Sequence, residues 1–161
     1  MEFISKPYRD SRMAFHNAVC KVASHYADHL VSVYGEVETT LEVKTKAKGR
    51  TCHAGNGHIF ILEDYVDRNE QWSAPNTLQE YKSFRDDPVI GNVVGKKSLR
   101  LGAVIAHEVA HWYHHARRET DHGLNWYMDR SLRQGKHRPH GDVWREMYAE
   151  LRINFINPFT D

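Results

Sequence analysis

Two histidines and a glutamate in the second half of the chain have the spacing of a metal-binding helix. The segment His107-Glu108-Val109-Ala110-His111 separates the histidines by four residues, which on an α-helix places them on one face, one turn apart. Both imidazoles can then bind one zinc ion, which lowers the pKa of a bound water to about 7. Glu108 is offset from this face and can accept a proton from that water. The pattern therefore predicts a metal ion and hydrolytic chemistry.

The surrounding sequence argues against the alternative, in which the three side chains are simply solvated on a surface helix. Small and apolar residues precede the motif at 103–106, and Val109 and Ala110 separate its histidines. A helix that is apolar nearly all round is buried, and burying polar side chains without a partner is costly. A bound cation would be that partner, so we expect a metal site.

A catalytic zinc usually has three protein ligands and a water, and two histidines compete for the third position. His140 and His122 each open the pattern His-Gly-x-x-Trp, which ends at Trp144 and Trp126 respectively. We predict His140, because it immediately precedes an amphipathic helix that can carry it into the site while Trp144 anchors the helix beneath. His122 is the alternative, and its simpler interpretation is a loop histidine.

Other residues are weaker candidates for the third ligand. Glu146 or Glu150 would give a site of two histidines and one glutamate, but neither belongs to a recognisable second motif. His114 lies seven residues after His107, about 10 Å farther along the helix and beyond the reach of a common ion. The predicted site therefore contains Zn²⁺, the catalytic base Glu108 and three ligands, His107, His111 and His140.

The sequence before the motif contains one segment with helical periodicity and two segments typical of strands. Apolar residues recur at spacings of three and four from Ser11 to Val33, which predicts an amphipathic helix. Glu36–Lys46 alternates apolar and charged residues and predicts a half-solvated strand. Turn-forming residues at 54–57, followed by the apolar run His58–Leu62, predict a hairpin. We expect these strands to form a small antiparallel sheet.

The rest of the chain is expected to contain the motif helix, a closing helix and polar connections. Residues 67–97 are polar and interrupted by proline and glycine, which is typical of connecting structure. A second polar connection runs from Arg118 to Pro139. The elements expected here are a short helix at 77–84, a helix capped by Ser98 and ending near Arg117, a helical turn at 124–132, and a last helix at 141–155.

Length and composition limit the class of protein. At 161 residues the chain is long enough for one compact domain, which we expect to span 1–161. The 22 basic and 21 acidic residues nearly cancel, so bulk charge gives no reason to expect a strongly steered partner. The two cysteines form no CxxC pair, and no apolar run reaches the roughly 18 residues of a membrane span. We therefore expect a cytoplasmic protein without a membrane partner.

The two motifs, HExxH at 107–111 and His-Gly-x-x-Trp at 140–144, together resemble those of the SprT-like, or Spartan-type, metalloproteases. The resemblance extends to the order of the expected elements. It implies a minimal zincin-like α+β fold, zinc held by His107, His111 and His140, and Glu108 as general base. The four-cysteine zinc ribbon that often follows the protease domain is missing from this sequence, so the resemblance is to the minimal domain.

The expected function is that of a zinc peptidase acting on unfolded or flexible protein. Zincin-like sites take substrate as an extended strand beside a sheet edge, and His58–Leu62 is the expected edge. The alternative is a non-catalytic zinc-stabilised binding module, for example for nucleic acid, although Glu108 favours the enzyme. The side chain that stabilises the oxyanion is left open among Tyr113, His58 and Tyr148.

Better-known members of the SprT-like family cleave proteins that include those crosslinked to DNA. The missing zinc ribbon and the balanced charge argue against DNA binding by this chain, whereas basic residues in the second connection favour it. A solvated loop is the simpler interpretation of these residues. If they contact DNA weakly, the contacts are expected from Arg130, Arg133, Lys136 and Arg138.

Overall fold

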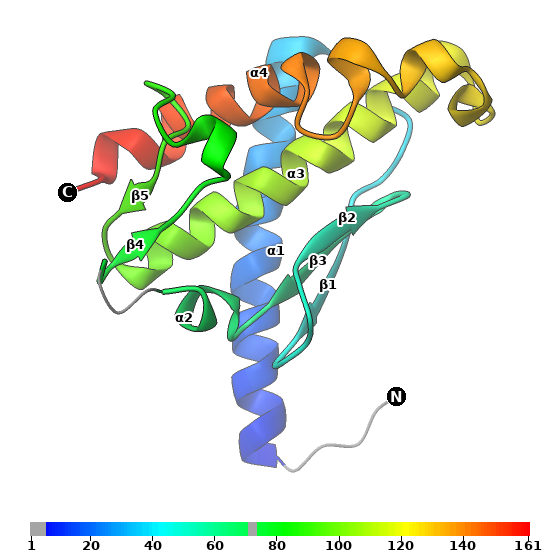
Figure 1. Ribbon diagram of the computed structural model, residues 1–161. Helices are drawn as coiled ribbons and strands as arrows, with labels where there is room; N and C mark the ends of the chain where they lie inside the picture. The colour runs from blue at the N-terminus through cyan, green and yellow to red at the C-terminus, as the bar shows by residue number, and fades with distance from the viewer. Residues whose placement is uncertain (1–5, 71–73) are drawn as a thin grey trace.

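The computed structural model describes residues 6–70 and 74–161, which form a mixed α+β fold (Figure 1). Helix α3 crosses α1, the larger of two small sheets lies against both helices, and α4 packs along α3. The helices are α1 (Lys6–Tyr34), α2 (Tyr65–Arg68), α3 (Lys97–His122) and α4 (Asp142–Leu151). The strands are β1 (Glu42–Lys46), β2 (His53–Gly55), β3 (His58–Leu62), β4 (Thr77–Leu78) and β5 (Val93–Val94).

The larger sheet has the order β1-β3-β2, so β3 is its central strand. β3 pairs parallel with β1 and antiparallel with β2, and the expectation of an antiparallel sheet is therefore wrong. Burial gives the reason, because Ile59, Ile61 and Leu62 are fully buried and the most apolar strand takes the covered centre. The expected first strand is also shorter than predicted, beginning at Glu42 rather than Glu36.

The two long helices form the core as their periodicity predicts. Val19, Ala23 and Leu30 are buried on the face of α1 that packs against α3 and β1. α3 begins one residue before the predicted cap Ser98, and no side chain caps it. It also continues beyond the predicted end to His122, so the motif lies well inside a helix rather than near its end.

The helix expected at 77–84 is wrong. Thr77 and Leu78 form β4, which pairs antiparallel with β5, and only Lys82–Phe84 makes one turn of 3-10 helix. Leu78 and Val93 are buried in the core, so a tertiary pairing overrides the local helical pattern. This pairing places residues 79–81 next to α3, where they line a cavity.

The connection between α3 and α4 is ordered by Arg118. Its guanidinium donates hydrogen bonds to the carbonyl oxygens of Leu132 and His137 at 2.8 and 3.2 Å and lies 4.0 Å from the centre of the Trp126 ring. Burial lowers the pKa of Arg118 to about 10. Three 3-10 turns follow one another here, at Trp126–Met128, Arg130–Leu132 and Gly135–His137.

The predicted last helix is confirmed as α4, which continues into a π-helical turn at Arg152–Ile156. Its predicted apolar stripe is also confirmed, since Trp144, Met147, Tyr148 and Leu151 are buried. Both cysteines carry free thiols. Within residues 6–70 and 74–161, no helix combines the length and the hydropathy that crossing a membrane requires.

Candidate metal centre

The imidazoles of His107, His111 and His140 meet at one point between α3 and the start of α4. Their Nε2 atoms form a nearly equilateral triangle, with separations of 3.2 Å for His107 and His111, 3.0 Å for His111 and His140, and 3.2 Å for His140 and His107. Among the described residues, this is the one group of three or more histidine, cysteine, aspartate or glutamate side chains that could hold a metal ion.

The size of this triangle suits a single metal ion. An edge of this length, divided by the square root of three, puts each nitrogen about 1.8 Å from the centre, while Zn–N bonds are about 2.0–2.1 Å long. The three nitrogens are therefore close enough together to act as ligands of a single ion of this size. Burial lowers the pKa of His107 well below its usual value and that of His111 to about 3, so both rings are neutral at pH 7, the form that binds metal.

The His-Gly step of the second motif is a turn that directs His140 toward α3. His140 has a φ of +60°, a left-handed conformation that costs a non-glycine residue roughly 1 kcal/mol. A Cβ on Gly141 would lie 2.8 Å from the carbonyl oxygen of Lys136 and 2.9 Å from that of Arg138, so only glycine fits there. Strained backbone of this kind clusters at functional sites.

Trp144 lies beneath the histidines, as the motif predicts. It is fully buried, and its indole N–H donates a hydrogen bond to the carbonyl oxygen of His107 at 3.2 Å. Its ring stacks on His111 with a centroid distance of 5.0 Å and contacts His107 and His140 edge to face at 4.7 Å. This one side chain thus ties α4 to all three imidazoles.

The other His-Gly-x-x-Trp sequence ends a helix instead. His122 is the exposed last residue of α3, about 16 Å beyond His111 at 1.5 Å per residue. Gly123, with φ of +86°, terminates the helix, and Trp126 packs edge to face against His115 at a centroid distance of 4.9 Å. His122 is therefore not part of the histidine group.

The remaining candidate ligands also lie elsewhere. Glu146 is exposed on α4, and Oε1 of Glu150 lies 2.9 Å from Nε2 of His29. His114 is buried and stacks on His137, with 3.2 Å between its Nε2 and Nδ1 of that residue. The structure thus separates all three from the triangle.

Glu108 is buried beside the histidines but is not one of the candidate metal ligands. Its Oε1 lies 4.0 Å from Nε2 of His107, and 6% of the residue is exposed. Burial raises the pKa of Glu108 to about 8. A cation held by the histidines would lower this pKa again, because an opposite charge nearby favours the carboxylate. The side chain is thus placed to exchange protons with a molecule at the metal position.

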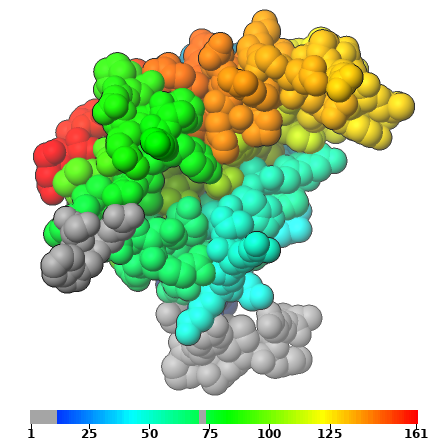
Figure 2. Space-filling model, viewed as in Figure 1, coloured from blue at the N-terminus to red at the C-terminus, as the bar shows by residue number. Residues whose placement is uncertain are grey.

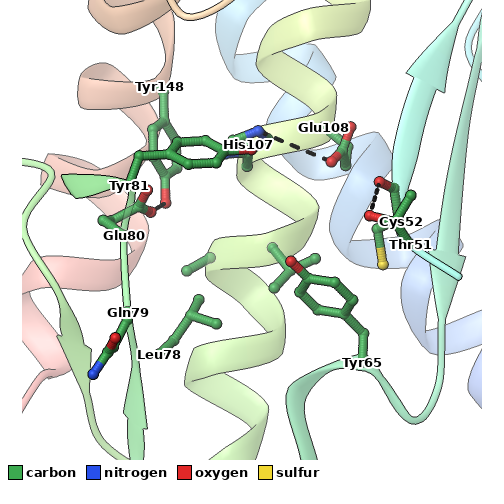
Figure 3. A pocket seen from close by; sticks show the side chains of 12 residues that line it. Thr51, Cys52, Tyr65, Leu78, Gln79, Glu80, Tyr81, His107, Glu108 and Tyr148 are labelled. Atoms are coloured by element: carbon green, nitrogen blue, oxygen red, sulfur yellow. Dashed lines mark hydrogen bonds and ion pairs between the residues drawn. The ribbon is translucent and has the colours of Figure 1, made fainter. Parts of the chain in front are cut away.

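Two cavities meet at His107 and Glu108. The smaller, of about 250 Å³, lies between the loop after β4 and the segment before β2 (Figure 3). The larger, of about 440 Å³, extends along β2 to Pro139 and His140. Figure 2 shows the surface hollowed between the cyan sheet and the green and orange segments. The candidate metal position is therefore reached through a cleft.

The sheet edge that borders this cleft is β2. β3 is the central strand, so the expectation of a substrate edge at His58–Leu62 is wrong. β2 pairs with β3 alone in its sheet, and its residues His53, Ala54 and Gly55 line the larger cavity. An unpaired strand edge presents N–H and C=O groups to which another extended chain can bond.

Comparison of the chain with protein-family models, with curated proteins and with solved structures finds no match. The resemblance to SprT-like proteases thus rests on the motifs at 107–111 and 140–144. The chemistry of the site has to be inferred from its geometry.

Both tyrosine hydroxyls that the sequence left open as oxyanion stabilisers are engaged in other hydrogen bonds, although Tyr148 lines the smaller cavity with its ring centroid 5.5 Å from that of His107. The Tyr113 hydroxyl donates a hydrogen bond to the carbonyl oxygen of Gly35 at 2.6 Å. The Tyr148 hydroxyl donates to Oε1 of Glu80 at 2.5 Å. His58 lies on the central strand and lines neither of the two cavities.

Tyr81 is not marked by the sequence, yet it lies at the site. Its ring centroid is 4.6 Å from that of His140 and 5.8 Å from that of His107. The residue sits in the segment that local patterns assigned to a helix. Long-range contacts, among them the pairing of β4 with β5, bring it to α3, so no local signal marks it.

Proposed function

We propose that the protein is a zinc-dependent peptidase of the SprT-like type with a minimal zincin-like fold. The supporting observation is the convergence of three histidines beside the buried carboxyl of Glu108, where two cavities meet. Structural zinc sites are usually closed by four protein ligands. Three histidine ligands leave one coordination position for water. A carboxyl beside that position is expected in an enzyme, where it accepts a proton from the reacting water.

Each residue of the site then has a defined task. Bound zinc supplies a Lewis acid and a water of lowered pKa. Glu108 takes the proton of the attacking water and later passes it to the leaving amine. Trp144 keeps α4 against α3 through its hydrogen bond to His107, so His140 stays with the histidines of the helix.

The proposed substrate is an extended or unfolded polypeptide. It would add as a further strand to the free edge of β2, which lines the larger cavity. Strand addition uses main-chain hydrogen bonds that almost any sequence can make. A folded protein has few unpaired strands to offer, so flexible segments are the expected targets.

Removing the metal tests the proposed function. Zinc-loaded protein is expected to hydrolyse a denatured protein such as casein, and a chelator should lower the rate about 1000-fold, since a metal ion contributes several kcal/mol to such reactions. Adding zinc back after the chelator is removed should restore the rate. Hydrolysis that survives complete zinc removal would contradict the proposal. A chain that carries one zinc and cuts nothing would favour the non-catalytic binding module.

DNA contact is proposed as a secondary property of the connection between α3 and α4. Its four basic side chains are exposed, on the segment that leads directly to His140. If they neutralise phosphates, affinity for DNA should fall with salt by a log–log slope of about 0.9 per phosphate. The residues concerned are Arg130, Arg133, Lys136 and Arg138.

A binding titration at several salt concentrations, on single- and double-stranded DNA, measures this slope. Changing the four residues to alanine should abolish binding. The matched control changes four exposed lysines near or within β1 and on α1, and it should leave the slope unchanged: Lys21, Lys44, Lys46 and Lys48. Equal losses in both variants would assign any binding to overall charge, and no binding at low salt would show that this connection does not contact DNA.

A further inference from the structure

Tyr81 stands where the two cavities meet and lines both of them. Figure 3 shows its ring projecting from the loop after β4 toward His107. Half of the residue is exposed, and its hydroxyl has no hydrogen-bond partner within residues 6–70 and 74–161. An O–H donor without a partner is thus held beside the histidine group.

A buried polar network fixes the loop that carries this tyrosine. Oε1 of Glu80 accepts the hydrogen bond of the Tyr148 hydroxyl at 2.5 Å and lies 3.6 Å from Nη1 of Arg152. Arg152 also donates to the carbonyl oxygen of Gly91 at 2.8 Å. Because a buried carboxylate is tolerated only when it is paired, this network holds the residue before Tyr81 firmly against α4.

We propose that Tyr81 is a catalytic residue whose hydroxyl donates a hydrogen bond to the oxyanion of the tetrahedral intermediate. The inference rests on the peptidase function proposed above. As the water oxygen bonds to the carbonyl carbon, the π electrons move to the carbonyl oxygen, and the water's proton goes to Glu108. Tyr81 stabilises the new negative charge and keeps its own proton.

The second half of the reaction reverses this charge movement. The C=O double bond reforms, the C–N bond breaks, and Glu108 gives its proton to the amine nitrogen. The hydrogen bond from Tyr81 is therefore strongest while the oxyanion exists and weak in the bound substrate. An interaction of this kind raises kcat rather than substrate affinity.

Tyr81→Phe tests the role, because it deletes one oxygen from a half-exposed ring and leaves the fold intact. Losing one oxyanion donor typically costs about 10²–10³ in kcat, so kcat should fall about 100-fold while KM and zinc content stay unchanged. A phosphinic peptide, whose tetrahedral oxygens mimic the oxyanion, should bind the variant more weakly by a similar factor. This binding measurement does not depend on turnover.

Tyr127→Phe is the matched control, since Tyr127 is exposed on the connection and lines neither cavity. Its kcat and phosphinic-peptide affinity should match those of the wild type. If Tyr81→Phe cleaves at the wild-type rate, or loses rate only through lost zinc or raised KM, the assignment of Tyr81 fails and the peptidase proposal stands. If the zinc-loaded wild type cleaves nothing, the peptidase proposal itself fails.

Discussion

Glu108→Gln is expected to lower kcat by at least about 100-fold while zinc stoichiometry and melting temperature are retained. A positioned general base contributes about 10²–10⁴-fold, and an amide cannot accept the water's proton. The fold should tolerate the change because burial raises the pKa of Glu108 to about 8. In the metal-free protein at pH 7 the carboxyl is therefore mostly uncharged, and glutamine has nearly the same shape. Initial rates on a fluorogenic peptide measure the effect.

Glu146→Gln makes the same chemical change on α4, at an exposed position outside the histidine group, and should keep the wild-type rate. This control separates the loss of a base from the loss of one negative charge. Equal, chelator-sensitive rates in wild type and Glu108→Gln would remove Glu108 from the mechanism.

His140→Ala is expected to lose its zinc, with the affinity lowered more than about 100-fold. Removing an outer partner of a metal ligand typically costs 10- to 100-fold, and His140 is one of three groups in direct reach of the metal position. The side chain is partly buried, lines the larger cavity and is not part of the apolar core. The metal-free fold should therefore survive the change.

His122→Ala is the matched control, because it alters the other histidine of a His-Gly-x-x-Trp sequence. Elemental analysis after gel filtration should find one zinc per chain in the wild type and in His122→Ala, and almost none in His140→Ala. The reverse result, with zinc kept by His140→Ala and lost by His122→Ala, would show that the third ligand is misassigned.

The part of the site that lies on one helix could be predicted from sequence. The spacing of His107 and His111 is a local property of any α-helix, and their apolar surroundings already indicated burial. The sequence favours His140 over His122 because an amphipathic helix follows it, and the structure has α4 at that position. What the sequence did not show is the strained backbone of His140 and the close approach of two carbonyl oxygens of the connection to Gly141.

Features that depend on long-range pairing could not be predicted. The sequence predicts β3 as an edge strand. The apolar strand of a hairpin can also pair with an earlier strand on its other side, as β3 does with β1. Which of the two arrangements forms depends on the packing of the whole fold. Tyr81 reaches the site through the pairing of β4 with β5. The sequence of the connection after α3 has the composition of a polar loop. Its order depends on Arg118, which bonds to three carbonyl oxygens four to nineteen residues away, and such contacts leave no local pattern in the sequence.

Mass spectrometry of an unfolded protein after incubation with the zinc-loaded chain tests the proposed peptidase activity most directly. We expect new N-termini from internal peptide bonds with the wild type and almost none with Glu108→Gln at equal zinc content. An uncut substrate from a wild-type chain that carries one zinc, or the same new N-termini from both proteins, would contradict it.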